Sequence, residues 1–308
     1  MMVPTHDASS VIAPIQKLVA SDQPGVLAII THIDGPSYRP LGAMMAVLAD
    51  KTRIGTLSSG CVEEDIAFHA MEALTRDEIK TVVYGRGSPY VDIQLPCGGG
   101  LQVTLIPQPD KDVLRALCHR HTDRRPTTIS VDMQSGAVSQ AEAGETGRNG
   151  DVFSVHVEPE MFFYVFGKGP EATTFAGLVQ SAGYPNLLLS PDDETLLIGQ
   201  KAGCQTRHLT SAHFPTDISP DAYSAILLFF HDHEWEPPIL LSACKSPAFY
   251  IGAQGSKRAA ELRSLEMEAL GLPRSELTKI KGPIGLIPSV RDARKLAVSV
   301  LADVLNGG

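Results

Sequence analysis

Strand-sized apolar runs alternate with helical patterns through the second half of this 308-residue chain, and that alternation constrains the fold more than any other feature. The apolar runs have the length and the aliphatic or aromatic content of buried strands, and they occupy residues 161–166, 186–189, 225–230 and 248–251. Stretches with helical spacing occupy residues 171–182, 236–243, 256–270 and 291–305. This alternation predicts a Rossmann-like, doubly wound parallel sheet in a C-terminal domain of residues 159–308.

The first block of the chain, residues 1–125, mixes strand and helix signals without a regular alternation and predicts a mixed α/β domain. We expect strands at residues 25–33, 43–48, 54–57, 81–84 and 101–106, and helices at residues 11–21, at residues 62–74 and after Asp110. Between the two blocks, residues 126–158 contain two strand-like runs around a polar, glycine-rich stretch. We expect connecting strands and a flexible linker there.

The composition excludes several classes of protein. Lys and Arg total 26 against 35 Asp and Glu, and the formal net charge of −9 argues against nucleic acid as a partner. No apolar run reaches the length of a membrane span, and the first residues lack the basic and apolar regions of a signal peptide. Five cysteines without a CxxC pair are typical of reduced thiols, so we expect a cytoplasmic protein.

Cys61 lies in the run SSGCVEE, residues 58–64, where a predicted strand turns into a predicted helix. Free N–H groups and the dipole at a helix start stabilise a thiolate, which can ligate a soft metal, hold a persulfide or attack an electrophile. Glu63 and Glu64 oppose this effect if they lie close to the sulfur. The alternative is a small buried cysteine that only packs, and position alone leaves both interpretations open.

A second cysteine, Cys97, precedes three glycines that include Gly98 and Gly99. Consecutive glycines allow positive φ angles and close backbone approach, so their N–H groups can form a concave anion site. The alternative is an ordinary turn before the strand that starts at Leu101. We expect Gly99→Val to harm ligand binding more than stability if the first interpretation holds.

The run FGKGPEA, residues 166–172, has the G-x-G-x-x-A pattern between a predicted strand and a predicted helix. Such a turn aims a helix N-terminus at a phosphate, and Lys168 adds a positive charge. An NAD site expects an acid about 20 residues on, but the second strand ends at Ser190 and Asp192 arrives late. This argues against ordinary NAD binding, leaves NADP open, and allows a nucleotide-type fold that has lost or repurposed its ligand.

Two further candidates follow later strands of the predicted sheet, at the edge where ligands bind. The run HDHE starts at His231 and could bind a metal or place a proton, or its polar residues could cap the next helix. Gly255 and Ser256 precede Lys257 and Arg258 at another predicted helix start. Cations at a helix N-terminus are unfavourable unless an anion lies there, so this pattern indicates a phosphate or carboxylate ligand.

Together these motifs resemble the xanthine dehydrogenase accessory (XdhC/CoxI) family. The resemblance runs in family order through GPSYRPLGAMM, SSGCVEEDI, PCGGG, FGKGPEA, HDHE, YIGAQGSKR and GPIGL. It implies an XdhC/CoxI N-terminal domain followed by a Rossmann-like C-terminal domain. The family's cofactor-binding cysteine falls on Cys61, its second cysteine on Cys97, and its glycine turn on Gly167 and Gly169.

The resemblance also implies a function: a molybdenum cofactor (molybdopterin) binding chaperone that assists cofactor sulfuration and insertion into xanthine dehydrogenase-type molybdenum hydroxylases. The implied partners are a molybdenum hydroxylase of that type, a cysteine desulfurase and a second copy of the chain in a homodimer. Enzymatic activity stays open, and an accessory role is favoured. The alternatives are an NAD(P)-dependent oxidoreductase, with NAD(P) or another nucleotide in the Rossmann-like domain, and a regulatory scaffold. The expected cofactor-binding residues are Arg39, Ser59, Gly60, Cys61 (also the metal ligand), Glu63, Cys97, Gly98, Gly99, Gly167, Lys168, Gly169, His231, Gly255 and Ser256.

Overall fold

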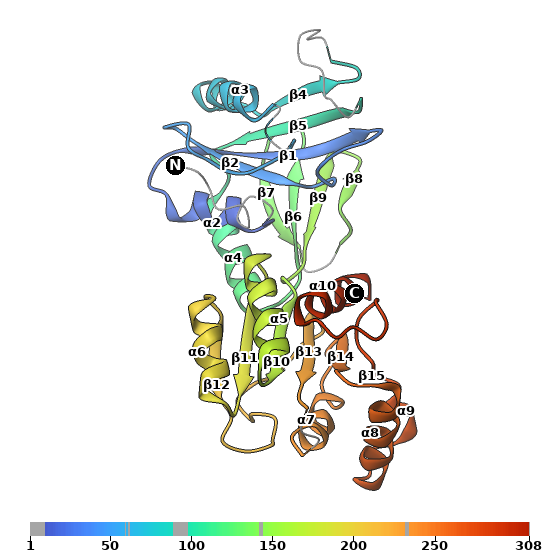
Figure 1. The fold of residues 1–308 in the computed structure, drawn as a ribbon. Helices are drawn as coiled ribbons and strands as arrows, with labels where there is room; N and C mark the ends of the chain where they lie inside the picture. Colours follow the sequence, from blue (N-terminus) through green and yellow to red (C-terminus); the bar gives the residue numbers. More distant parts are fainter. Residues whose placement is uncertain are drawn as a thin grey trace. The chain divides into compact units, whose positions relative to one another are not determined.

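The computed structural model describes residues 10–58, 60, 62–88, 98–141, 144–231 and 234–307. Its contacts divide the chain into two compact units, Met1–Pro159 and Glu160–Gly308 (Figure 1). Cys61, Cys97 and Ser59 lie outside the described residues.

An antiparallel five-stranded sheet, in the order β3-β2-β1-β5-β4, forms the centre of the first unit. Its strands are β1 (Gly25–Asp34), β2 (Met44–Leu48), β3 (Arg53–Gly55), β4 (Lys80–Gly85) and β5 (Gly100–Pro107). The central strand is apolar on both faces, because Val26 and Ile30 contact one core while Leu27 and Ile29 contact the other. Figure 1 shows helix α3 (Glu63–Arg76) on one face and α2 (Ala13–Ala20) on the other.

A second, four-stranded antiparallel sheet follows helix α4 (Lys111–Thr122). It has the order β7-β6-β9-β8, with β6 (Thr127–Asp132), β7 (Val138–Ala141), β8 (Gly147–Asn149) and β9 (Val152–Val157). Strands β7 and β8 lie where we expected a flexible linker, so that expectation was wrong. Their side chains are polar because these edge strands are exposed or half-buried. Ile129 and Phe153 of the inner strands are fully buried and join the core of the first unit.

The second unit has a six-stranded sheet in the order β12-β11-β10-β13-β14-β15, and every pair in it is parallel. The doubly wound α/β prediction is therefore confirmed. Helices α5 and α10 pack on one face, and α7 and α8 pack on the other. The elements are β10 (Phe162–Gly167), α5 (Pro170–Ser181), β11 (Asn186–Ser190), α6 (Asp193–Lys201), β12 (Gln205–His208), β13 (Ser224–Phe229), α7 (Glu236–Ala243), β14 (Tyr250–Ala253), α8 (Lys257–Ala269), α9 (Arg274–Leu277), β15 (Ile280–Lys281) and α10 (Ala293–Asn306).

The strand order reverses between β10 and β13, which lie side by side at the centre of this sheet. In open α/β sheets, ligands bind outside the carboxyl ends of the strands at such a reversal. The carboxyl ends of β10 and β13 therefore define the position in this unit where a ligand is expected. None of the helices in the described part of the chain is long and apolar enough to cross a membrane.

Candidate functional site

Glu63, the first residue of helix α3, organises the loop that contains the first cysteine motif. Its Oε1 accepts hydrogen bonds from Thr56 Oγ1 at 2.5 Å, Leu57 N at 3.0 Å and Ser58 N at 2.8 Å. Its Oε2 accepts from Ser58 Oγ at 2.7 Å and Val62 N at 3.2 Å. The carboxylate thus joins the end of the sheet to the helix start.

The Glu63 side chain is ionised although it is buried. Burial, the largest single influence, raises its pKa, but hydrogen bonds from the Ser58 and Thr56 hydroxyls and from the Ser58 and Gly60 N–H groups outweigh burial and lower the pKa to about 2. Gly60 is exposed, and its φ is +101°, with open space where a side chain would project. The charged Glu63 carboxylate therefore holds the loop by hydrogen bonds. Gly60, the residue before Cys61, is exposed.

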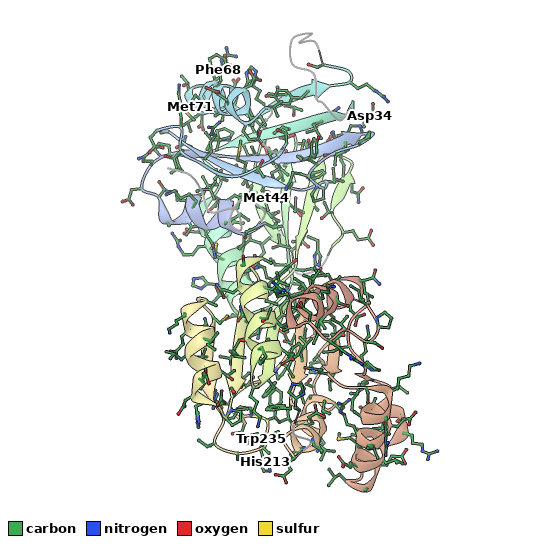
Figure 2. All side chains as sticks on the ribbon, viewed as in Figure 1. Asp34, Met44, Phe68, Met71, His213 and Trp235 are labelled. Atoms are coloured by element: carbon green, nitrogen blue, oxygen red, sulfur yellow. The ribbon has the colours of Figure 1, made fainter. Side chains whose placement is uncertain are left out.

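The glycines after the second cysteine motif contact the loop that follows β1. A Cβ added to Gly99 would lie 2.0 Å from the carbonyl oxygen of Pro36 and 3.1 Å from that of Asp34. Asp34, labelled in Figure 2, also pairs with Arg86 at 3.7 Å. Gly98 has φ +70°, with nothing within 4 Å of an added Cβ. The structure thus places Gly99 against the start of the GPSYR loop.

Arg39 lies in the same loop after β1 and is half-buried. Burial lowers the pKa of its guanidinium, and the Ser37 hydroxyl donates a 2.7 Å hydrogen bond to the Arg39 carbonyl. Within the described ranges, no hydrogen bond joins Gly60 or Glu63 to Gly98 or Gly99. The predicted cofactor contacts of these residues therefore stay predictions.

In the second unit, the glycine turn after β10 lies against the neighbouring strand and against helix α6. A Cβ on Gly167 would lie 2.5 Å from the Phe229 carbonyl oxygen, which explains the glycine. The Lys168 N–H donates to that same carbonyl at 3.3 Å. The Gly169 N–H donates to the Thr195 hydroxyl at 2.9 Å. The turn is thereby fixed from both sides.

His231 follows β13, and its Nε2 lies 3.4 Å from the Glu171 carboxylate in the first turn of α5. The histidine side chain is 63% exposed, so the pair lies at the surface of the carboxyl edge. Beside it, Trp235, labelled in Figure 2, stacks on Phe230 with ring centroids 5.9 Å apart. In the described part of the chain, no group of three or more His, Cys, Asp or Glu side chains could hold a metal ion.

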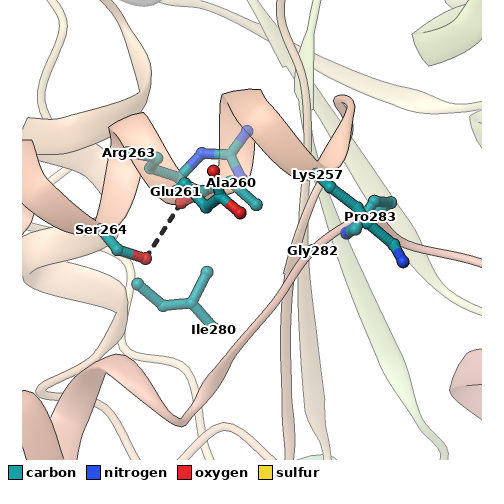
Figure 3. Close-up of a pocket in the computed structure, with 8 residues that line it drawn as sticks. All are labelled: Lys257, Ala260, Glu261, Arg263, Ser264, Ile280, Gly282 and Pro283. Atoms are coloured by element: carbon teal, nitrogen blue, oxygen red, sulfur yellow. Dashed lines mark hydrogen bonds between the residues drawn. The ribbon is translucent and has the colours of Figure 1, made fainter.

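Gly255 and Ser256 lie at the start of α8, where the Ser256 hydroxyl accepts a hydrogen bond from Ala259 N at 3.1 Å. The same helix carries the buried Arg263, which bonds Glu236 at 2.8 Å and the Gln254 carbonyl at 2.7 Å. A groove of about 360 Å³ lies beside Arg263 (Figure 3). Its lining residues are Lys257, Ala260, Glu261, Arg263, Ser264, Ile280, Gly282 and Pro283.

Comparison with known proteins decides the family. Residues 163–304 match the XdhC Rossmann domain, and residues 18–85 match the XdhC and CoxI family. The molybdenum cofactor insertion chaperone PaoD of Escherichia coli (strain K12) is 34% identical over 301 residues, which are 97% of this chain and 88% of that protein. The chain belongs to the XdhC and CoxI family.

Two more distant similarities span nearly the whole of this XdhC/CoxI protein. A protein of Bacillus subtilis (strain 168) named as a probable subunit of xanthine dehydrogenase is 23% identical, over 94% of this chain and 95% of that protein. A crystal structure titled as a xanthine dehydrogenase from Bacillus halodurans has a TM-score of 0.78 at 22% identity, over 97% of this chain and 95% of that chain. The second similarity shows that the fold is shared.

The thiolate form is disfavoured in the three described cysteines of this XdhC/CoxI protein. Burial raises the thiol pKa of Cys118 and of Cys204. Burial and the charge of Glu276 raise that of Cys244 to about 11, against a smaller opposite effect of Lys279. Metal ligation and nucleophilic attack use the thiolate, so these three side chains are less suited to either role than an ionised cysteine. Cys61 and Cys97 remain as the candidates of the family motifs.

Several residues that fix the XdhC/CoxI motifs had no structural role in our sequence interpretation, in which Asp192 appeared only as an acid that arrives late for an NAD site. Asp192 caps helix α6 by accepting from Thr195 N at 2.8 Å, and it also accepts from the Thr195 hydroxyl at 2.6 Å. The available signal was an Asp three residues before a Thr at a helix start. Glu171 and Arg263 gave no such signal, because each pairs with a residue far away in the sequence.

Gly99 tests whether the glycine motif is needed for packing. We expect Gly99→Ala to lower the free energy of unfolding by about 1–3 kcal/mol, because its Cβ meets backbone oxygen that cannot rotate away. The expectation that Gly99→Val affects binding more than stability does not fit this contact. Urea unfolding measures the change, and Gly147→Ala, with nothing within 4 Å, is the control. Equal stability of both variants would contradict the assignment.

Proposed function

We propose that this protein binds the molybdenum cofactor as cargo, through Cys61, and delivers it to a xanthine dehydrogenase-type molybdenum hydroxylase. The observation that carries the proposal is 34% identity, over nearly the full chain, to a relative named as a molybdenum cofactor insertion chaperone. The raised thiol pKa values of Cys118, Cys204 and Cys244 support it by removing competing cysteines.

In this proposal the loop before α3 presents a soft ligand. In the sequence, Cys61 stands two residues before Glu63, the first residue of α3, and a cysteine near a helix start is favoured as a thiolate by the helix dipole. A thiolate suits the metal end of the cofactor. The Glu63 carboxylate acts as a positioning group, because its oxygens already accept hydrogen bonds from the loop. Backbone N–H groups of Gly98 and Gly99 and the Arg39 guanidinium are the proposed partners for the phosphate.

Delivery requires that the cargo leave. A carrier that only binds tightly cannot transfer its cargo, so a partner must favour a state of lower affinity. The proposed partners are the recipient hydroxylase and a cysteine desulfurase that supplies sulfur for the cofactor. The loop before α3 is where we expect the change in affinity, since one carboxylate holds its backbone in place.

The test is anaerobic purification of wild type, Cys61→Ala and Cys118→Ala, followed by molybdenum and pterin analysis. We expect Cys61→Ala to retain at least tenfold less molybdenum and pterin than wild type, which corresponds to about 1.4 kcal/mol of binding free energy or more. Cys118→Ala, which removes a half-buried thiol of raised pKa, should retain the wild-type amounts. Wild-type retention by a normally melting Cys61→Ala protein would refute the proposal.

A further inference from the structure

The second unit has the strand order of folds that hold a dinucleotide at the reversal between their central strands. Its glycine turn follows β10 in the position of a phosphate-binding turn. Such binding requires free N–H groups at the start of the next helix, no negative charge beside them, and room for a ribose between the turn and the second strand.

The N–H groups of the turn are largely used within the protein. The Lys168 N–H donates to the Phe229 carbonyl at 3.3 Å, and the Gly169 N–H donates to the Thr195 hydroxyl at 2.9 Å. Pro170 is the first residue of α5 and has no N–H to give. Of the three backbone positions after Gly167, two donors are engaged and the third is absent, so an anion at this helix start would have to use the N–H groups from Glu171 onwards.

The start of α5, where a phosphate would be expected to bind, already carries a negative charge. Glu171 lies in the first turn of α5, where a carboxylate is stabilised by the helix dipole. Its side chain is 19% exposed and lies 3.4 Å from His231 Nε2, across the reversal between β10 and β13. A dianionic pyrophosphate brought to this helix start would be repelled by that carboxylate. The Lys168 ammonium offsets part of this repulsion, and it also contributes to the lowered pKa of Asp192, to a smaller extent than the hydrogen bonds from Thr195 do.

Hydrogen bonds within the protein join the turn after β10 to the turn after β11, where a ribose would be expected. The Thr195 hydroxyl accepts from Gly169 N–H at 2.9 Å and donates to Asp192 at 2.6 Å, so the turn after β10 is joined directly to the turn after β11. The second strand ends at the fully buried Ser190, and the nearby Asp192 carboxylate is used as the cap of α6. Strand β11 itself ends without an acid, and of the two that follow it, Asp192 caps α6 and the exposed Asp193 lies 3.7 Å from His208 Nε2.

From these contacts we infer that the Rossmann-type edge of this unit is closed to dinucleotides, with Glu171 in the place of the phosphate charge and Thr195 in the place of the ribose. The glycine turn serves to pack β10 against β13 and to join α5 to α6. This inference does not depend on the proposed cargo, because it concerns NAD(P) and the groups of the second unit alone.

The test is titration of wild type, Glu171→Ser/Thr195→Val and Glu171→Gln with NADH, NADPH and ADP-ribose. Trp235, the one tryptophan of the chain, stacks on Phe230 at the end of β13 and reports binding by its fluorescence. We expect no saturable binding by wild type up to about 1 mM of each probe. The double variant frees the Gly169 N–H and removes the carboxylate, so it should bind ADP-ribose at least tenfold more tightly than wild type.

The single variant Glu171→Gln keeps the Thr195 bond and should gain less affinity than the double variant. Glu261→Ser removes an exposed acid from helix α8 and should bind no better than wild type. Saturable wild-type binding of any probe below about 1 mM would overturn the inference. So would a double variant that melts like wild type and still binds ADP-ribose no better, because Glu171 and Thr195 would then not be what closes the edge.

Discussion

Glu63→Ala is expected to lower the free energy of unfolding of the first unit by about 3–5 kcal/mol. The variant removes the Glu63 acceptor from at least four donors, namely the Thr56 and Ser58 hydroxyls and the N–H groups of Leu57 and Ser58, while the Val62 N–H keeps the Ser58 Oγ at 3.0 Å. Buried donors without a partner each cost about 1–3 kcal/mol, and some here would regain water as the loop opens. Urea unfolding followed by circular dichroism measures the loss.

The same carboxylate predicts a specific pH dependence. The pKa of Glu63 is lowered from the ordinary 4.5 to about 2, so its stabilising effect is complete above pH 4.5 and is lost as the pH falls towards 2. The shift corresponds to about 3 kcal/mol at neutral pH. We therefore expect Glu63→Gln to be less stable than wild type at pH 7 and to lose less stability than wild type between pH 5 and pH 3.

Glu64→Gln is the matched control, because Glu64 is the next residue and is exposed. It should follow the wild-type pH profile. If Glu63→Gln followed that profile as well, the carboxylate would not be the anchor of the loop. Molybdenum retention by Glu63→Gln is a separate measurement, and a normal retention with reduced stability would limit Glu63 to a role in folding.

The elements that the sequence predicted well are those whose side chains are buried on both faces. Strand β13 is buried along its whole length, as is β14, and both had appeared as short apolar runs. Helix α6 and strand β12 were missed because Leu197 and Ile198 of α6 are exposed and β12 is a polar edge strand. Periodicity reports burial, so it fails where an element is held at an edge by backbone hydrogen bonds.

In the candidate site too, features set by neighbouring residues in the sequence were predicted, whereas contacts between distant residues were not. The motifs placed Gly60, Gly99 and Gly167 at turns, and the structure gives Gly99 and Gly167 a packing reason for the missing side chain. The sequence interpretation treated Glu63 as a charge that opposes a thiolate, whereas the structure shows it bonding the loop before α3. Spacing along the chain cannot reveal which donors surround a carboxylate, because that depends on how β3 and α3 meet.

A buried ion pair in the second unit is the clearest example of a distant contact with a large expected effect. Arg263 Nε lies 2.8 Å from Glu236 Oε2, and the two side chains are 4% and 1% exposed. Arg263 also donates to the Gln254 carbonyl at 2.7 Å, so it connects the start of α7 to the turn after β14. The first turn of α7 favours the negative partner.

Removing one partner of this ion pair should destabilise the protein more, relative to its share, than replacing both partners with apolar residues. We expect Arg263→Met alone, or Glu236→Leu alone, to lower the free energy of unfolding by about 3–5 kcal/mol, because each leaves one buried charge without its partner. The double variant Glu236→Leu/Arg263→Met leaves neither charge and should lose at least about 2 kcal/mol less than the sum of the two single losses. Urea unfolding of the four proteins gives this coupling as a double-mutant cycle.

Arg258→Met is the matched control, because Arg258 is an exposed arginine in the same helix. Its loss should stay within about 0.5 kcal/mol of zero. Strictly additive losses in the cycle would mean that Arg263 and Glu236 act independently, and the pair would then not be what holds α7 and the Gln254 turn together. Because Glu236 neutralises the buried Arg263 within the protein, Lys257 is the exposed cation among the residues that line the groove of Figure 3.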